Sequence, residues 1–141
     1  MKYLLLIYLD EAEMRDGDYL RDCRAEAVQL ARDLDAAGQY VASSPLQPTS
    51  TATSVRVREG KPLVTDGPFA ETREQLGGYL LIDVPDLDDA IRVAARFPVS
   101  RRGTVEIRPL GELVGLPPTR VARDEREGPH QENRTTADAR G

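Results

Sequence analysis

The sequence is poor in the residue types that disulfide scaffolds, metal sites and imidazole catalysis require. It contains one cysteine, Cys23, one histidine, His130, and no tryptophan. A single cysteine excludes an intrachain disulfide, and the lack of a Cys/His cluster predicts no metal site. Because aromatic residues are scarce, the core must be built from Leu, Val, Ile and Ala. The cysteine count agrees with a reducing compartment, and we expect a cytoplasmic protein.

Long apolar segments and an excess of positive charge are also missing. The apolar run at 3–9 is too short for a membrane span, or for a signal-peptide core followed by a cleavage site. The formal net charge of −5 argues against a nucleic-acid surface, which needs a concentrated basic face. We therefore expect neither a membrane nor a nucleic acid as a partner.

The apolar residues that are present predict an alternation of strands and helices. Residues 3–9 are apolar on both faces, which is typical of a central strand, and 53–58 alternate strictly before a Glu59-Gly60 turn. Helices are predicted after the first strand and after the strand at 79–84. The remaining predicted strands are 40–46, 62–65 and 104–108.

The first predicted helix has clear boundaries. Asp16 and Asp18 are available as N-caps, and Gly38 is well placed just after the C-terminus. We interpret Cys23 as a core residue, since it shares the apolar stripe of this helix. The stripe consists of Leu20, Cys23, Ala27, Leu30, Ala31 and Leu34.

The second predicted helix starts after Asp86, which can cap it, and Pro98 ends it. Its apolar residues recur at spacings of three and four, so one face should be buried. The stripe expected to face the core consists of Leu87, Ala90, Ile91, Ala94 and Phe97.

This order of elements predicts an α+β fold with the ferredoxin-like βαββαβ pattern and a small added hairpin. In that pattern both helices cover one face of an antiparallel sheet. Leu5 and Ile7 can then reach the helices, whereas Leu4 and Leu6 cannot. Because the second face also carries apolar residues, we expect a homodimer that packs sheet to sheet.

The composition changes near the C-terminus. Val121 is the only large aliphatic residue from Pro117 onward, and the remainder is mostly charged or small. Such a stretch cannot bury enough surface to offset its ordering entropy. We expect a domain at 1–111, and a linker with a disordered charged tail at 112–141.

The loop at 64–72 is the most distinctive segment of the chain. Asp66-Gly67-Pro68 is strong turn chemistry, because Asp bonds nearby backbone, Gly adopts unusual dihedrals and Pro fixes φ. Thr72 with Gln75 resembles a capping box for one helical turn, which Gly77-Gly78 would end. Long structured loops of this kind are often functional.

Four blocks resemble the DGPF branch of the YCII-related family. They are the start at 1–8, the loop at 65–72, Gln75-Leu76-Gly77-Gly78-Tyr79 before a strand, and 105–109. The resemblance covers about residues 1–111. It implies a dimeric α/β-barrel, which agrees with the fold expected from the uncovered sheet face.

The resemblance implies less about activity. Some YCII-related enzymes use a His-Asp pair for elimination on a chlorinated aromatic, and some DGPF proteins are encoded beside extracytoplasmic-function sigma factors. A His-Asp site cannot be carried over, because His130 lies in the predicted tail. The imidazole that would exchange protons near neutral pH is therefore missing from the predicted domain.

Carboxylates, a phenol and arginines remain as site candidates. Strand alternation directs several of them away from the helices, and the loop can add two more carboxylates. As catalytic candidates we name Asp66, Glu71 and Tyr79, and as ligand-binding candidates Asp83, Glu106, Arg108 and Arg56. The alternative is structural: Glu106 and Arg108 form ordinary ion pairs, and Asp66 only shapes its turn.

Two functions of different classes follow. The first is a small-molecule-binding dimer with a cleft between the sheet face and the loop, acting without a cofactor as a lyase or isomerase on a small cyclic or anionic compound. The second is a regulatory or interaction module associated with a sigma factor. A catabolic gene neighbourhood would favour the first, and an adjacent sigma factor the second.

Overall fold

The structure is a computed structural model that describes residues 1–119. The predicted tail from residue 120 onward, including His130, lies outside the described residues. Contacts divide the chain into two units, 1–111 and 112–141. The main elements of the first unit are β1 (Lys2–Leu9), α1 (Gly17–Ala36), β2 (Tyr40–Pro45), β3 (Thr53–Arg58), β4 (Lys61–Asp66), β5 (Gln75–Asp83), α2 (Leu87–Arg96) and β6 (Thr104–Pro109). Three short 3-10 turns are η1 (Glu13–Arg15), η2 (Thr49–Thr51) and η3 (Pro98–Arg101).

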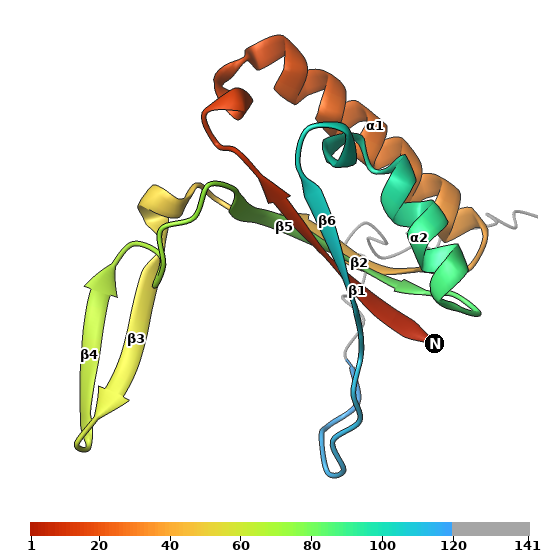
Figure 1. The fold of residues 1–141 in the computed structure, drawn as a ribbon. Helices are drawn as coiled ribbons and strands as arrows, with labels where there is room; N and C mark the ends of the chain where they lie inside the picture. The colour runs from red at the N-terminus through yellow and green to blue at the C-terminus, as the bar shows by residue number, and fades with distance from the viewer. Residues whose placement is uncertain (120–141) are drawn as a thin grey trace, which may run out of the picture. The chain divides into compact units, whose positions relative to one another are not determined.

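Four strands form an antiparallel sheet in the order β2-β5-β1-β6. Both α1 and α2 lie on the same face of this sheet (Figure 1). The α+β, ferredoxin-like arrangement predicted from the pattern is therefore confirmed. β1 is paired at both edges, by β5 and by β6, and is therefore the central strand that the sequence predicts.

The core lies between the sheet and the helices. Leu5, Leu80 and Ile82 are the largest fully buried side chains. The helices contribute residues such as Leu30, Leu34 and Ala90 to the same cluster, while Val105 and Ile107 of β6 pack against it. Leu5 and Ile7 belong to this cluster, so the predicted helix-facing side of the first strand is confirmed.

Local signals define both ends of α1. The Asp16 carboxylate accepts hydrogen bonds from the backbone N–H groups of Asp18 and Tyr19, which satisfies donors that have no partner within the helix. Gly38 adopts a φ of +70° just beyond the C-terminus, a conformation that glycine allows. Cys23 is buried, as predicted.

The predicted face of α2 was partly wrong. Asp86 caps the helix through the N–H of Asp89, as expected. However, Leu87 and Ile91 are each 49% exposed, and Val93 is buried in their place. Positions 90, 93 and 94 lie on one face, whereas position 91 is rotated by about 100° from position 90.

β3 and β4 form a separate two-stranded hairpin that stands clear of the main sheet (Figure 1). Glu59 and Gly60 both have positive φ, of 51° and 74°. Two such residues in succession are typical of the type I′ turn that joins hairpin strands, so the predicted turn is confirmed. Most side chains of the hairpin are exposed.

The predicted helical turn at Thr72 was wrong. Gln75 is the first residue of β5, and its side-chain amide donates to the Thr72 carbonyl over 2.6 Å, so the Thr72–Gln75 pair closes a loop. Gly78 lies within β5, where a Cβ would come within 2.9 Å of the backbone oxygen of Ser44 on β2. Glycine is therefore used for close strand approach.

The second unit is described only at 112–119. These residues are exposed, and the backbone N–H of Leu116 donates to the Leu113 carbonyl over 3.4 Å, closing a turn. Within residues 1–119 no helix combines the length and apolar character that crossing a bilayer requires.

Candidate functional site

The face of the main sheet that is turned away from the helices carries a mixture of apolar and polar side chains. Because strand residues alternate between faces, it presents the neighbours of the buried positions. We call this surface the open face and define it by Leu4, Leu6, Tyr79, Leu81, Glu106 and Arg108. The four apolar or aromatic members are half-buried, whereas Glu106 and Arg108 are exposed.

Strand register places the candidate residues in rows across the open face. Leu6 of β1 pairs with Tyr79 on one side and with Glu106 on the other. Ser44 of β2 extends the row beyond Tyr79. Since Tyr79 and Glu106 are two strand spacings apart, their backbones are about 10 Å from each other. A phenol and a carboxylate therefore flank an apolar floor of molecular width.

The next row brings a guanidinium to the same surface. Arg108 pairs with Leu4, which pairs in turn with Leu81. Arg108 Nη1 lies 3.8 Å from Glu106 Oε2, and the two side chains are 68% and 47% exposed. Such a long, exposed ion pair contributes little to stability, so both groups remain available to a ligand.

Asp83, the fourth candidate on the main sheet, has a structural partner. Its carboxylate Oδ1 lies 3.2 Å from the amino group of Met1, which also donates to the Val84 carbonyl over 2.9 Å. Both groups are exposed, at 65% and 50%, so this ion pair is also weak and the carboxylate at the end of β5 remains accessible.

The other three candidates lie on the hairpin and the loop that follows it. Asp66 ends β4, Arg56 lies in β3 and Glu71 lies in the loop, all exposed. Asp66 pairs with Thr53, which shares a hairpin face with Val55. Arg56 follows Val55 and therefore lies on the opposite face from Asp66. Among residues 1–119, no hydrogen bond or ion pair connects these three side chains to the open face.

Backbone groups of Gly67, rather than the Asp66 carboxylate, hold the DGPF turn. Gly67 has a φ of +97°, its N–H donates to the Ala52 carbonyl over 2.7 Å, and its carbonyl accepts from Ser54 Oγ over 2.7 Å. Within the described part of the chain, the Asp66 carboxylate makes no hydrogen bond or ion pair. Its charge is therefore not required by the turn.

One carboxylate that the sequence reasoning missed fixes the base of the hairpin. The two oxygens of Glu11 accept hydrogen bonds from the N–H and the hydroxyl of Thr49, both over 2.8 Å. The N–H of Glu11 donates to Gln75 Oε1 over 3.0 Å. We call Glu11, Thr49 and Gln75 the clasp. It joins three segments distant in sequence, and no local pattern marked it.

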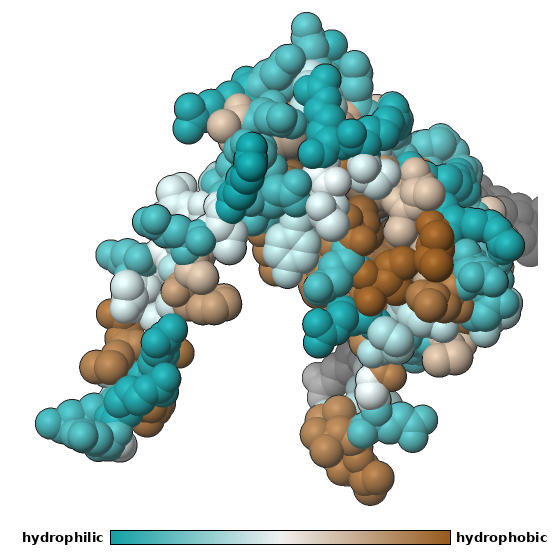
Figure 2. All heavy atoms as spheres, in the orientation of Figure 1, coloured by the Kyte–Doolittle hydropathy of each residue, from teal (hydrophilic) through white to brown (hydrophobic). Residues whose placement is uncertain are grey.

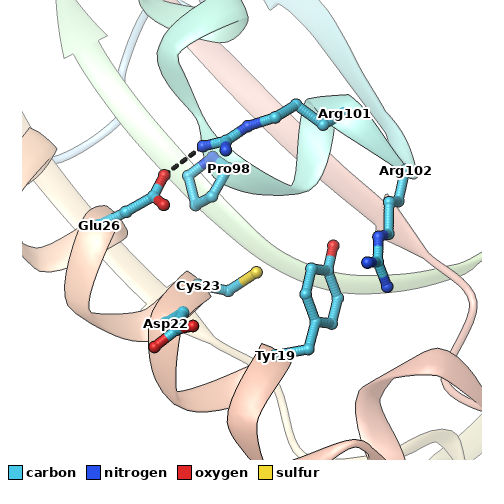
Figure 3. A pocket seen from close by; sticks show the side chains of 7 residues that line it. All are labelled: Tyr19, Asp22, Cys23, Glu26, Pro98, Arg101 and Arg102. Atoms are coloured by element: carbon cyan, nitrogen blue, oxygen red, sulfur yellow. Dashed lines mark hydrogen bonds and ion pairs between the residues drawn. The ribbon is translucent and has the colours of Figure 1, made fainter.

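A shallow pocket of about 280 Å³ lies between α1 and η3, on the helical side (Figure 3). Arg101 is paired with Glu26, and the Arg102 guanidinium stacks 4.0 Å from the centre of the Tyr19 ring. The pocket lining consists of Tyr19, Asp22, Cys23, Glu26, Pro98, Arg101 and Arg102. Two carboxylates balance two guanidinium groups, so the lining has no net charge to select a ligand.

One titratable group of this pocket, the Tyr19 phenol, has a shifted pKa. Burial raises the pKa of the Tyr19 phenol, and its hydrogen bond with Cys23 raises the pKa further, against a smaller lowering by Arg102. The phenol therefore stays protonated. The sequence had suggested only a core role for Cys23. Within the described residues, no group of three or more acidic, Cys or His residues could hold a metal ion.

Comparison with known proteins identifies relatives of this chain. The model of the YCII-related domain matches residues 1–113. Uncharacterized protein R00369 of Rhizobium meliloti (strain 1021) is 36% identical over 118 residues, which cover 78% of this chain and 92% of the relative. The family match at 1–113 includes the whole main sheet, both helices and the hairpin.

A solved structure with partial similarity is 5-chloro-2-hydroxyhydroquinone dehydrochlorinase from Burkholderia phenoliruptrix AC1100, in complex with 2,5-dihydroxybenzoquinone. Its TM-score to this chain is 0.45 at 12% identity, and the match covers 79% of this chain and 94% of that one. A similarity this distant carries no argument about chemistry.

Proposed function

Because the chain belongs to the YCII-related domain family, we propose that it is a homodimer that binds a small cyclic anion on its open face. The observation that carries this proposal is the pair of rows across the sheet. They combine an apolar floor with one phenol, one carboxylate and one guanidinium. Apolar clefts with a few convergent polar groups are the usual form of small-molecule sites.

Each polar group has a role that matches its chemistry. Arg108 binds the anionic part of the ligand, since a guanidinium offers a rigid fork of donors to a carboxylate. Tyr79 donates a hydrogen bond, and Leu4 and Leu6 contact the ring of the ligand. The dimer closes the open face, which excludes water and strengthens these interactions.

The proposed reaction class is that of a lyase or isomerase without a cofactor. Such reactions need a base that removes a proton and a donor that stabilises the charge left behind. Glu106 on the open face is one carboxylate for this work, and Asp66 and Glu71 from the loop are others. Their exposure in a single chain gives way to partial burial when a second copy covers the open face.

Binding of benzoate tests this proposal against benzamide, its neutral analogue. Isothermal titration should show that Arg108→Gln weakens benzoate binding about tenfold or more and leaves benzamide binding nearly unchanged. The matched control is Arg24→Gln, which removes an exposed guanidinium from α1. Equal benzoate affinity in both variants, or a dimer that binds neither probe, would contradict the site.

The regulatory module associated with a sigma factor stays a prediction from the family resemblance. This function needs a surface that binds another protein, whereas the proposed function needs a site for a small molecule. Gene neighbours remain the simplest observation that separates the two functions.

A further inference from the structure

The β3–β4 hairpin has one apolar and one largely polar face. Register pairs Val55 with Val64 and Val57 with Pro62, and these four residues share a face that we call the valine face. The opposite face carries Arg56, Arg58 and Lys61 together with Leu63. Val55, Val57 and Val64 are 62%, 60% and 66% exposed. Brown apolar atoms are visible at the surface along this hairpin in Figure 2.

A hairpin with this pattern needs a partner surface. A two-stranded hairpin is marginally stable alone in water, and strict alternation leaves the valines without burial unless something covers them. Among the described residues, 53–66 make no hydrogen bond or ion pair with the four strands of the main sheet. Within the described part of the chain, the valine face is therefore uncovered.

The proposed ligand site is also incomplete in the described part of one chain, because Asp66 is not linked to its other residues. Asp66 lies on the valine face, because its pair with Thr53 is two positions from the Val55–Val64 pair. Among residues 1–119, no hydrogen bond or ion pair connects Asp66 to Tyr79, Glu106 or Arg108. A second copy that covers the valine face would place Asp66 at an interface between copies.

The surface area that a stable dimer buries also favours a second copy as the partner of the valine face. Four strands of about six residues give the open face roughly 19 by 20 Å, so two facing sheets contribute roughly 800 Å² of planar area. Standard stable interfaces bury about 1,200–2,000 Å². The face of each hairpin measures about 10 by 20 Å and would cover an equal area on the partner. Two hairpins therefore add roughly 800 Å² of buried area. Sheets and hairpins together reach the standard size.

We propose that each hairpin is an arm that packs its valine face against the second copy, at the rim of that copy's open face. This inference rests on the proposed dimer and deepens it. Two-fold symmetry makes the exchange reciprocal, so each arm receives cover and provides it. Asp66 of one copy then completes the site that contains Tyr79, Glu106 and Arg108 of the other.

Neighbouring positions on β4 provide a matched pair of variants. Val64 and Leu63 are both exposed within one chain, at 66% and 52%, but they lie on opposite faces of the hairpin. Val64→Glu should raise the dimer dissociation constant at least tenfold in sedimentation equilibrium, because it buries a charge. Leu63→Glu should change it less than about threefold. Equal effects would overturn the arm while leaving the sheet-to-sheet dimer and benzoate binding intact.

Photo-crosslinking identifies the surface that the arm contacts. A benzophenone amino acid replaces Val64 or, as control, Leu63, and the protein is mixed with a ¹⁵N-labelled copy to separate links between chains from links within one. Position 64 should link to residues of β1, β5 or β6 in the other copy, and position 63 should link far less. Links from position 64 only within its own chain, or a wild-type chain that sediments as a monomer, would overturn the proposal.

Discussion

Ile82 and Val64 occupy similar positions in an alternating strand, yet Ile82 is 0% exposed and Val64 is 66% exposed. The main sheet finds its cover within the chain, because α1 and α2 lie across one face (Figure 1). In the part of the chain that the structure describes, the hairpin has no such cover. An alternating pattern thus predicts that one face will be buried, but the element that buries it must be found separately.

We expect truncation of a side chain to lower the free energy of unfolding more in the main sheet than in the hairpin. Leu80→Ala should lower the free energy of unfolding by about 2–5 kcal/mol, because it leaves a cavity in the core. Val64→Ala should cost less than about 0.5 kcal/mol at concentrations low enough to dissociate the proposed dimer, since its side chain is exposed in one chain. Urea titrations of both variants measure the difference. Equal costs under these dilute conditions would mean that the hairpin packs within its own chain.

The clasp at the junction of the two regions predicts an intermediate effect. Glu11→Gln leaves one oxygen to accept the two Thr49 donors and places an amide donor beside them. The local opening free energy near Thr49 should fall by about 1–2 kcal/mol, because charge-assisted hydrogen bonds are lost. Amide hydrogen exchange of Thr49 measures this, while the core amides should keep their protection.

The control for the clasp is Glu13→Gln, an exposed carboxylate close by in the sequence. It should leave exchange at Thr49 unchanged. If Glu11→Gln behaves like this control, the clasp does not hold the base of the hairpin. If it exposes the core amides as well, the two regions unfold together.

Features of the fold that depend on near neighbours could be predicted. The Asp16 and Asp86 caps, the Gly38 terminus and the Glu59-Gly60 turn each use short-range chemistry that the sequence displays. The uncovered sheet face was also predictable, because the apolar residues of 3–9 outnumber what two helices on one side can cover. Alternation then assigned Tyr79, Glu106 and Arg108 to one face.

Features that depend on distant partners could not be predicted. Thr72 and Gln75 fit a capping box, but Gln75 instead serves β5 and the clasp, whose other members are remote in sequence. The choice of Val93 over Ile91 in α2 depends on how the helix rotates against the sheet. In the proposed dimer, Asp66 reaches the open face of a second copy, and this contact between chains has no local pattern in the sequence.

The smallest predicted effect concerns an ion pair within the covered region. Hydrogen bonds from Gln29 and from Arg96 lower the pKa of Asp33, and Arg96 Nη2 lies 2.7 Å from Asp33 Oδ2, which ties α2 to α1.

A lowered pKa means that the folded state favours the charged carboxylate. The stabilisation is therefore fully present above the unfolded pKa, about 3.8, and is lost as pH falls through the lower folded value. Asp33→Asn should lower the melting temperature by about 1–3 °C at pH 7, and this difference should shrink as the pH falls below about 3.8. Asp35→Asn, an exposed neighbour on α1, should show no comparable loss. A difference that grows on acidification would contradict the assigned sign. A change in hairpin exchange would contradict the separation of the two regions.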